Sequence, residues 1–431
     1  MNKKQLILAA VLGSLCSTAL AGGFSIRGKS ASSLGNGTAG TAVLAEDASV
    51  VYNNPAAMQD LDGTHFSMLL HTIVSDVQFE DKGSNISGPA TSSVDDPHFV
   101  PNLYYVKTLQ EDMRFGLGIY APFGLGLDYD DEWMGRYITT SSDLKVINIS
   151  PALSFRASNK MNLGVGIDLQ YLDATLANAV DFGTICYAMS TSYPTSGCAD
   201  PQNNDGSQEL TGSNWAVGFS FGLTYDIDAL TRFGLSYHSA TRHDIEGDSD
   251  FEGTPVELQA MDMFTDTGGS LTLNLPETLS LGLSRQISPQ LQLLADATWT
   301  RWSRYDALVV EFDNNTPTST TEQNWQDVWR FSVGGNYRLN ETWLLRAGFS
   351  HDQTPIPNAQ YRSPRVPDTD RNWFSLGSRT RLNPEMELDL AIAYTPPKSY
   401  RIDRTDSLGH ILNGEYESEI LYLTAQFNWQ F

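Results

Sequence analysis

The chain has 431 residues, of which 51 are acidic and 27 basic, giving a formal net charge of −24. This acidity argues against binding of nucleic acid or other anionic partners through bulk electrostatics. The mean hydropathy is negative, and no apolar run after the N-terminal segment is long enough for a membrane helix, which excludes a helical inner-membrane protein. A soluble exported protein and a membrane barrel with alternating apolar residues both remain compatible with these values.

Residues 1–21 have the three parts of a signal peptide. Lys3 and Lys4 provide the positive charge, residues 6–15 form a short apolar stretch, and Ala19-Leu20-Ala21 is a small-residue cleavage site. The apolar stretch is too short for a membrane span, which needs about 20 residues. We therefore expect a mature chain that begins at Gly22 and leaves the cytoplasm.

Residues 22–62 contain no alternating strand pattern, although about 40 residues here precede the first predicted strand. They are rich in Gly, Ala and Ser with scattered larger apolar residues, which favours packing over disorder. Both a periplasmic tail and a plug in a barrel lumen fit this composition. Gly35, Gly37 and Gly40 match the spacing of a dinucleotide-binding loop, but no strand precedes them, so we expect tight turns rather than a phosphate site.

From residue 63 onward, bulky apolar residues alternate with small or polar ones. The clearest strand places one set on one face and Ala, Gly, Ser and Thr on the other; its bulky residues are Trp215, Val217, Phe219, Phe221, Leu223 and Tyr225. The pattern recurs over residues 163–171, 279–284, 388–394 and 421–431. Bulky residues on one face of long strands, opposite small and polar ones, are typical of a membrane barrel with lipid outside and a polar lumen.

Short turns and long polar connections alternate along residues 63–431. Short turns are predicted at residues 110–112, 158–160, 226–230, 287–289, 339–341 and 382–385, where turn residues gather. Long connections are predicted at 81–97, 124–142, 178–212, 247–269, 312–324, 354–371 and 396–414. Six turns and seven loops join 14 strands, so the sequence predicts an all-β, 14-stranded antiparallel transmembrane barrel, wide enough to need filling or to conduct water.

Several short motifs along the chain have a recognisable combination. The N-terminal ones are Gly23-Phe24, Leu34-Gly35, Ala45-Glu46-Asp47-Ala48 and Asn54-Pro55-Ala56; the later ones are Ala121-Pro122-Phe123-Gly124-Leu125, Trp133 with Gly135-Arg136-Tyr137, Trp299-Thr300-Arg301-Trp302-Ser303 and the terminal Phe431. Together they resemble the FadL family of outer-membrane transporters for long-chain fatty acids and hydrocarbons. The resemblance implies that residues 22–62 form a hatch in the lumen, with Phe24, Asn54, Pro55 and Ala56 as gating residues.

The same resemblance implies a function without catalysis and without a cofactor. The expected ligands are hydrophobic small molecules, most of all long-chain fatty acids, which move passively across the outer membrane of a Gram-negative cell. Outer-membrane lipid and lipopolysaccharide are expected to surround the barrel, and the C-terminal Phe431 is expected to engage the barrel assembly machinery.

The third predicted strand breaks after a regular alternation. Pro122 removes a ladder donor and Gly124 loosens the strand. The resemblance implies that Ala121, Pro122, Phe123 and Gly124 form a kink through which ligand leaves sideways into the membrane. The other interpretation is that Pro122 only begins an outer loop.

The loop at 247–269 carries an apolar set at helical spacing. Thr254 and Glu257 have the spacing of a capping box, with Pro255 at the first helical position. Flexible, polarizable Met side chains suit promiscuous apolar binding. With the loop at 178–212, the resemblance implies a ligand groove formed by Leu258, Met261, Met263, Phe264, Tyr187, Met189 and Tyr193. The alternative is that these residues only pack onto a neighbouring loop.

Cys186 and Cys198 are the two cysteines of the mature chain. They lie in one polar loop of an exported protein, so we expect a disulfide. No histidines lie nearby, so we do not expect a metal site there. The acidic run of Asp128, Asp130, Asp131 and Glu132 fits a solvated loop better than a Ca²⁺ site.

Two other functions compete with hydrophobic transport. A general aqueous porin would need an open lumen, which a hatch over residues 22–62 would fill. An outer-membrane lipid hydrolase is suggested by Ser236 and His238, which share an inward face as a nucleophile and base could. The sequence around them shows no matching acid or amide, so this hypothesis is the weaker one.

Overall fold

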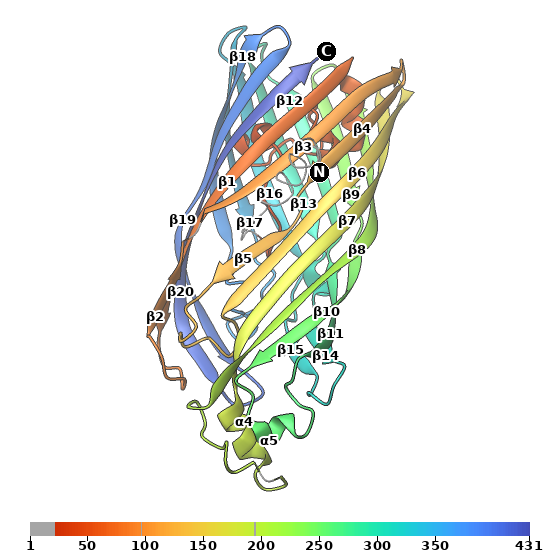
Figure 1. Cartoon of the computed structure of the whole chain (residues 1–431). Helices are drawn as coiled ribbons and strands as arrows, with labels where there is room; N and C mark the ends of the chain where they lie inside the picture. Colours follow the sequence, from red (N-terminus) through yellow and green to blue (C-terminus); the bar gives the residue numbers. More distant parts are fainter. Residues whose placement is uncertain (1–21, 96, 194) are drawn as a thin grey trace.

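Tilted antiparallel strands form a closed barrel in the computed structural model, which describes residues 22–95, 97–193 and 195–431 (Figure 1). The predicted signal peptide lies outside the described residues. The barrel closes where its first strand, β1 (Thr64–Asp81), pairs with its last, β20 (Ile411–Gln430), in a register from His65↔Gln430 to Asp81↔Gly414. Closure pairs the backbone groups of both strands, as a lipid environment requires.

The described residues form 20 strand segments. These make up 14 wall strands, because six of the wall strands are each divided into two segments. The divided ones are β2 (Thr91–Val94) with β3 (Pro97–Gln110), β4 (Met113–Tyr120) with β5 (Gly124–Asp128), β9 (Thr231–His238) with β10 (Thr241–Glu252), β11 (Thr267–Leu275) with β12 (Thr278–Gln286), β13 (Leu291–Thr300) with β14 (Ala307–Phe312), and β15 (Ser319–Glu322) with β16 (Val328–Arg338). The others are β1, β6 (Ser141–Ser158), β7 (Met161–Asp181), β8 (Asp205–Asp226), β17 (Trp343–Asp352), β18 (Arg371–Asn383), β19 (Met386–Thr405) and β20.

The predicted strand count and antiparallel barrel are confirmed. The short turns lie at one end of the barrel, with the C-terminus, and the long connections with helices α4 (Phe182–Met189) and α5 (Val256–Gln259) lie at the other (Figure 1). Most of the long loops are shorter than predicted; for example, β7 and β8 extend to residues 181 and 205, and β19 and β20 extend to 405 and 411. These strand ends carry polar residues outward and buried apolar residues such as Ile402 and Leu412 inward, so they lack the outward apolar face by which the other strands were predicted.

The bulky residues of the alternating pattern face outward. Trp215 and Val217 are 61% and 68% exposed, whereas Ser220 and Thr224 on the other face of β8 are buried. Exposed apolar side chains on this scale would be unfavourable in water but are at their lowest free energy against lipid. The alternation in the sequence therefore identifies the side of each strand that faces the membrane.

Residues 22–62 lie against the inner wall of the barrel. Their helix α2 (Ala31–Gly35) packs on β17 to β20, and the 3₁₀ helix η1 (Pro55–Asp60) packs on β4 and β6 to β8. Between them lies α3 (Val50–Asn53). At these contacts the wall strands carry glycines, which leave room for the N-terminal segment. A Cβ on Gly348, for example, would overlap the Asn36 carbonyl group. No helix in the described part of the chain is long and apolar enough to cross a membrane.

Gly348→Ala should loosen the N-terminal segment without unfolding the barrel. The added methyl group must displace Asn36, and overpacking of this kind costs roughly 1–3 kcal/mol. We expect faster protease cleavage within residues 22–62, while the heat-modifiable gel shift of the barrel is retained. The control is Gly335→Ala, whose Cβ would come no closer than 3.0 Å to its surroundings. Equal cleavage rates in both variants would contradict the close packing.

Candidate functional site

The third wall strand is interrupted at residues 121–123. β4 ends at Tyr120 and β5 begins at Gly124, and both segments pair with β6. On its other side, β4 pairs with β3 only as far as Leu103↔Ile119. No pairing joins β5 to β3 in the described part of the chain. The wall therefore lacks its backbone ladder between β5 and the first half of β3.

The N-terminal segment supplies the hydrogen bonds that the interruption removes. The Ile26 amide donates to the Pro122 carbonyl at 3.0 Å, and the Gly124 amide donates to the Phe24 carbonyl at 3.0 Å. The Lys29 ammonium also donates to the Pro122 carbonyl, at 3.2 Å. Because an unpaired buried backbone group costs about 1–3 kcal/mol, the interrupted strand and the N-terminal segment stabilise each other.

Phe24 is enclosed by four aromatic side chains from three other parts of the chain. Its ring centroid lies 4.9 Å from that of Trp302 and 5.9 Å from those of Phe123, Tyr305 and Trp325. The side chain is 2% exposed. The contacts with Trp302 and Tyr305 are edge-to-face, and pairs of this kind each add about 0.5–1.5 kcal/mol beyond burial. The predicted gating residue thus lies between the interrupted strand and an aromatic cluster.

The side chain of Asn54 connects the C-terminal part of the N-terminal segment to the wall. Its side-chain oxygen accepts from the Ala56 amide at 3.0 Å and caps η1, which begins at Pro55. Its side-chain amide lies within hydrogen-bonding distance of the carbonyl groups of Ala42, Leu223 and Leu235, at 2.5, 3.1 and 3.1 Å. The Asn-Pro-Ala element therefore joins η1 to both β8 and β9.

Buried ion pairs hold the middle of the same segment. Arg346 of β17 contacts Glu46 at 2.5 Å and Asp389 at 2.6 Å, and Arg379 of β18 contacts Asp389 at 2.9 Å. The side chains of Arg346 and Asp389 are fully buried. Removing one member of such a set leaves an uncompensated charge and typically costs about 3–5 kcal/mol. Residues 22–62 are thus held at both ends and in the middle.

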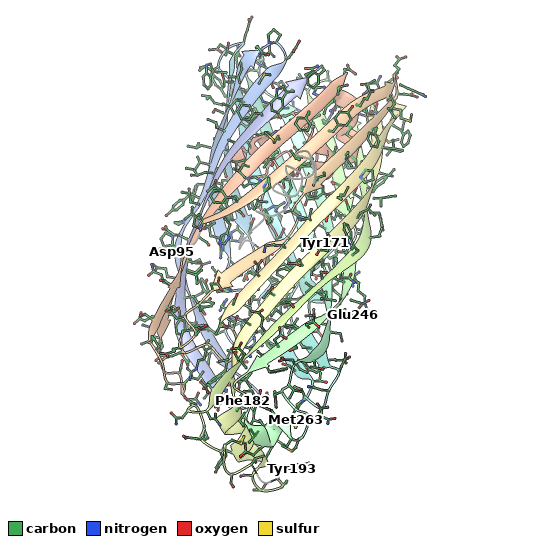
Figure 2. The ribbon with its side chains drawn as sticks, viewed as in Figure 1. Asp95, Tyr171, Phe182, Tyr193, Glu246 and Met263 are labelled. Carbon is green, nitrogen blue, oxygen red and sulfur yellow. A yellow bond between two sulfur atoms is a disulfide. The ribbon has the colours of Figure 1, made fainter. Side chains whose placement is uncertain are left out.

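A cavity of about 880 Å³ opens at the end of the barrel that carries the long connections. Three of the predicted groove residues line it, namely Met189, Met263 and Phe264, and Figure 2 shows Met263 and Phe182 at this end. Aliphatic side chains of the wall, including Leu308 and Val310, complete its apolar part. We name this space the outer cavity.

The remaining predicted groove residues do not line the outer cavity. Leu258 is fully buried in a small cluster with Phe182 and the two cysteines, and Met261 packs against this cluster. Tyr187 and Tyr193 are 65% and 51% exposed. Helical spacing identified an apolar face, but part of that face packs the two loops together.

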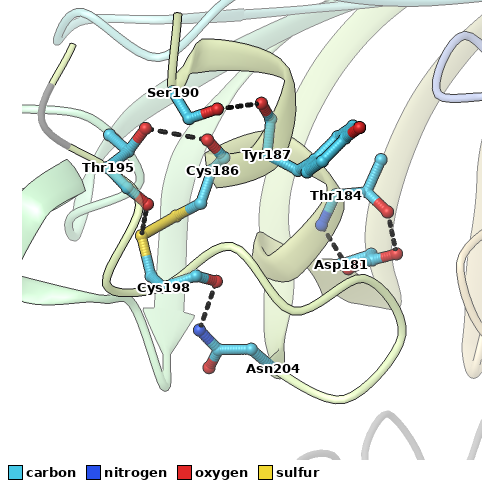
Figure 3. Close-up of a disulfide and its surroundings, with 8 residues drawn as sticks. All are labelled: Asp181, Thr184, Cys186, Tyr187, Ser190, Thr195, Cys198 and Asn204. Atoms are coloured by element: carbon cyan, nitrogen blue, oxygen red, sulfur yellow. Dashed lines mark hydrogen bonds between the residues drawn. A yellow bond between two sulfur atoms is a disulfide. The ribbon is translucent and has the colours of Figure 1, made fainter.

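A disulfide between Cys186 and Cys198 ties α4 to the chain that follows it (Figure 3). The Thr195 hydroxyl donates to the Cys186 carbonyl at 2.8 Å, and Asn204 donates to the Cys198 carbonyl at 3.1 Å. Asp181 caps the start of α4 by accepting from the Thr184 amide. Both cysteines belong to the same buried cluster as Leu258, against which Met189 packs, so this covalent link helps to hold the loop in place.

The capping box predicted at Thr254 and Glu257 is wrong. α5 begins after Pro255 without a side-chain cap. The Thr254 hydroxyl instead donates to the Phe264 carbonyl at 2.6 Å, which closes the loop across its base. The residue spacing was correct for a cap, but a longer-range contact uses the same hydroxyl.

The structure also corrects the surroundings of Ser236 and His238. An acid does lie nearby, since Asp168 is 3.8 Å from Nδ1 of His238. However, Nε2 of His238 is hydrogen-bonded to the Tyr52 carbonyl, and Oγ of Ser236 has no hydrogen-bond partner in the described residues. The hydrogen bond between nucleophile and base that hydrolysis needs is therefore not formed. The described residues include no group of three or more His, Cys, Asp or Glu that could hold a metal ion, the acidic run at 128–132 included.

His410 lies beside the outer cavity and bridges two loops. Its Nε2 is 3.0 Å from Asp181 and its Nδ1 is 2.7 Å from Asp406, which lines the cavity. Burial alone would lower the pKa of His410, but hydrogen bonds and charges from the two carboxylates outweigh it and raise the pKa to about 9. The ring is therefore a cation at neutral pH, and it joins residues 406–410 to the end of β7.

Comparisons with known proteins agree with this architecture. The family model described as outer membrane protein transport protein (OMPP1/FadL/TodX) matches residues 12–431. The chain is 26% identical to the long-chain fatty acid transport protein of Escherichia coli K12, over 94% of this chain and 95% of that one. It is 28% identical to outer membrane protein P1 of Haemophilus influenzae, over 94% and 92%.

Solved structures share the fold. A Pseudomonas aeruginosa FadL homologue superposes with a TM-score of 0.88 at 23% identity, covering 95% of this chain and 100% of that one. The toluene transporter TodX of Pseudomonas putida superposes with a TM-score of 0.74 at 20% identity, covering 94% and 99%.

Raising the pH should release the 406–410 loop. The pKa of His410 in the folded protein, about 9, lies above its ordinary value of 6.5. Its contribution to stability is therefore complete below about pH 6.5 and is lost as the pH rises through about 9. After correction for intrinsic exchange, hydrogen–deuterium protection of residues 406–410 should fall between pH 7.5 and 10. His410→Gln, which is always neutral, should show low protection with no such pH dependence; the same fall in this variant would exclude His410 as the cause.

Proposed function

The chain belongs to the outer membrane protein transport protein family (OMPP1/FadL/TodX), and from this premise we propose that it carries hydrophobic compounds, in the first place long-chain fatty acids, passively across the outer membrane. The observation that carries the proposal is the interruption of the wall at residues 121–123. Backbone groups that the neighbouring strand leaves unpaired there are hydrogen-bonded by Phe24 and Ile26. A wall open at one point and closed by a displaceable segment suits sideways release of an apolar ligand.

Capture takes place in the outer cavity. Met189, Met263 and Phe264 give it an apolar face on an otherwise polar end of the barrel. Each methylene group that a ligand buries there contributes about 0.8 kcal/mol, so a long chain is held far better than a short one. The two methionines adapt to chains of different shape.

Residues 22–62 act as the hatch. They fill the lumen below the outer cavity, and their close packing on wall glycines leaves a general aqueous porin poorly supported. Movement of Phe24 out of its aromatic cluster would open space for a ligand beside Phe123. The anchors at Asn54 and Arg346 are remote from Phe24 in the sequence and hold the rest of the hatch during this movement.

Exit is lateral, through the wall between β3 and β5. The backbone ladder is missing there, and Ala121, Pro122, Phe123 and Gly124 form the edge of the opening. The ligand enters the outer leaflet, where its free energy is low. Transport in this scheme runs down a gradient maintained by consumption inside the cell.

The direct test is uptake of labelled oleate by cells that lack their own fatty acid porin and express this chain. Saturable uptake, well above that of cells with the empty vector at matched outer-membrane expression of a folded barrel, is the expected result. Free leakage of small sugars and ions would instead identify an aqueous porin. Folded barrel without uptake of oleate or of labelled toluene would refute the proposal.

Closing the wall should abolish uptake. In a variant with Val at positions 122, 123 and 124, strand-forming residues replace the interruption, and we expect oleate uptake to fall below about a tenth of the wild-type rate with the heat-modifiable gel shift unchanged. Pro151→Val is the matched control, because Pro151 also lies in a wall strand but opposite Leu117 in a paired region. If the triple variant transports oleate at the wild-type rate, the lateral route is excluded.

A further inference from the structure

Lys29 lies in the hatch beside the interrupted wall strand. The residue is 2% exposed, and no carboxylate of the described residues lies within 4.0 Å of its side-chain nitrogen, Nζ. The buried Arg27 and Arg346, by contrast, each contact a carboxylate at 2.6 Å. A buried cation without an acid partner is unfavourable unless neutral groups satisfy it. The groups around Nζ therefore indicate why a lysine is placed here.

Two carbonyl groups and an aromatic ring surround Nζ of Lys29. It donates to the carbonyl of Ile26 and, at 3.2 Å, to the carbonyl of Pro122. It also lies 5.5 Å from the centroid of the Tyr52 ring, within the range of a cation–π contact. Ile26 belongs to the hatch and Pro122 to the interruption of the third wall strand. One side chain thus joins the two segments whose backbones meet at the opening.

The main chain of Lys29 is bound to the other side of the opening. The Tyr104 hydroxyl donates to the Lys29 carbonyl at 3.1 Å. Tyr104 belongs to β3 and follows Leu103, the residue at which the pairing of β3 with β4 ends. Lys29 is therefore a point at which β3, the hatch and residues 121–123 are connected. A side chain that only filled space here would need no hydrogen bond to residues 121–123.

The backbone contact that Lys29 reinforces is short. It consists of one isolated bridge, between Ser25 and Phe123, flanked by two amide-to-carbonyl hydrogen bonds. An ammonium makes stronger hydrogen bonds to carbonyl groups than a neutral amide does. Movement of Ile26 away from Pro122 separates two acceptors of the same side chain, so Lys29 opposes this movement more than a neutral residue would.

We propose that Lys29 is the latch of the lateral opening. Its side chain holds residues 24–26 against residues 121–123, and so it determines how often the wall opens for a ligand. This inference rests on the proposed function, in which the ligand leaves sideways between β3 and β5. Lys29 is a positioning residue in this scheme, because it needs no contact with the ligand. Its loss should make opening more frequent without changing capture in the outer cavity.

The first measurement is labelling of the variant Ile26→Cys with a water-soluble maleimide on the purified full-length barrel. Ile26 is 2% exposed, so a thiol at this position reacts only when residues 24–26 leave the wall. Cys186 and Cys198 form a disulfide and do not react. Adding Lys29→Met, which keeps the length of the side chain but not its donors, should speed labelling about fivefold or more. Lys29→Arg, which keeps the charge and the donors, should stay within about twofold of the parent.

The second measurement is oleate uptake by porin-deficient cells that express the chain without the labelling probe. Lys29→Met should raise the maximal rate about threefold and leave the half-saturating concentration within about twofold of wild type, because the outer cavity is unchanged. An unchanged or lower maximal rate would overturn the role of Lys29 in transport. Gln59→Met is the matched control. It removes the hydrogen bond from Gln59 to Ser154, 2.9 Å long and at the other end of the hatch, and should change neither labelling at position 26 nor uptake.

A probe remote from the opening separates a latch from general support of the hatch. Ala57 in η1 is fully buried, and labelling of Ala57→Cys should not change when Lys29→Met is added. Equal acceleration at positions 26 and 57, or no acceleration at position 26, would overturn the inference.

A milder variant serves if Lys29→Met does not fold. Tyr104→Phe removes the hydrogen bond to the Lys29 carbonyl and should speed labelling at position 26 about twofold or more; an unchanged rate would overturn the inference. Absence of oleate uptake by the wild type would instead refute the proposed function itself, and labelling would still decide whether Lys29 holds residues 24–26 in place.

Discussion

A backbone in lipid must have every polar group hydrogen-bonded, and the structure of this chain follows from that requirement. It forces the strands into a closed ring, with β1 paired to β20 along almost their full length. It also makes any break in a wall strand a problem that other residues must solve. At residues 121–123, residues 24–26 of the N-terminal segment provide the missing hydrogen bonds, so the segment that packs against the inner wall also completes it.

This double role couples two events that would otherwise be independent. Displacing Phe24 from its aromatic cluster also removes partners from the Pro122 carbonyl and the Gly124 amide, so movement inside the lumen weakens the wall at the same place. The rest of the N-terminal segment is held by groups of another kind, the Asn54 amide and the buried ion pairs of Arg346. Weak aromatic and backbone contacts at one end and charged contacts in the middle favour movement of the end alone.

The fold was largely predictable because alternation and turn composition are local properties. Strand number, short turns and the outward face of residues 215–225 depend on neighbours within a few residues. Other features depend on contacts between distant segments and have no local signature. The Thr254 hydroxyl binds Phe264 instead of capping a helix, Asp168 meets His238 from another strand, and the ends of β19 and β20 pair within the loop predicted at residues 396–414.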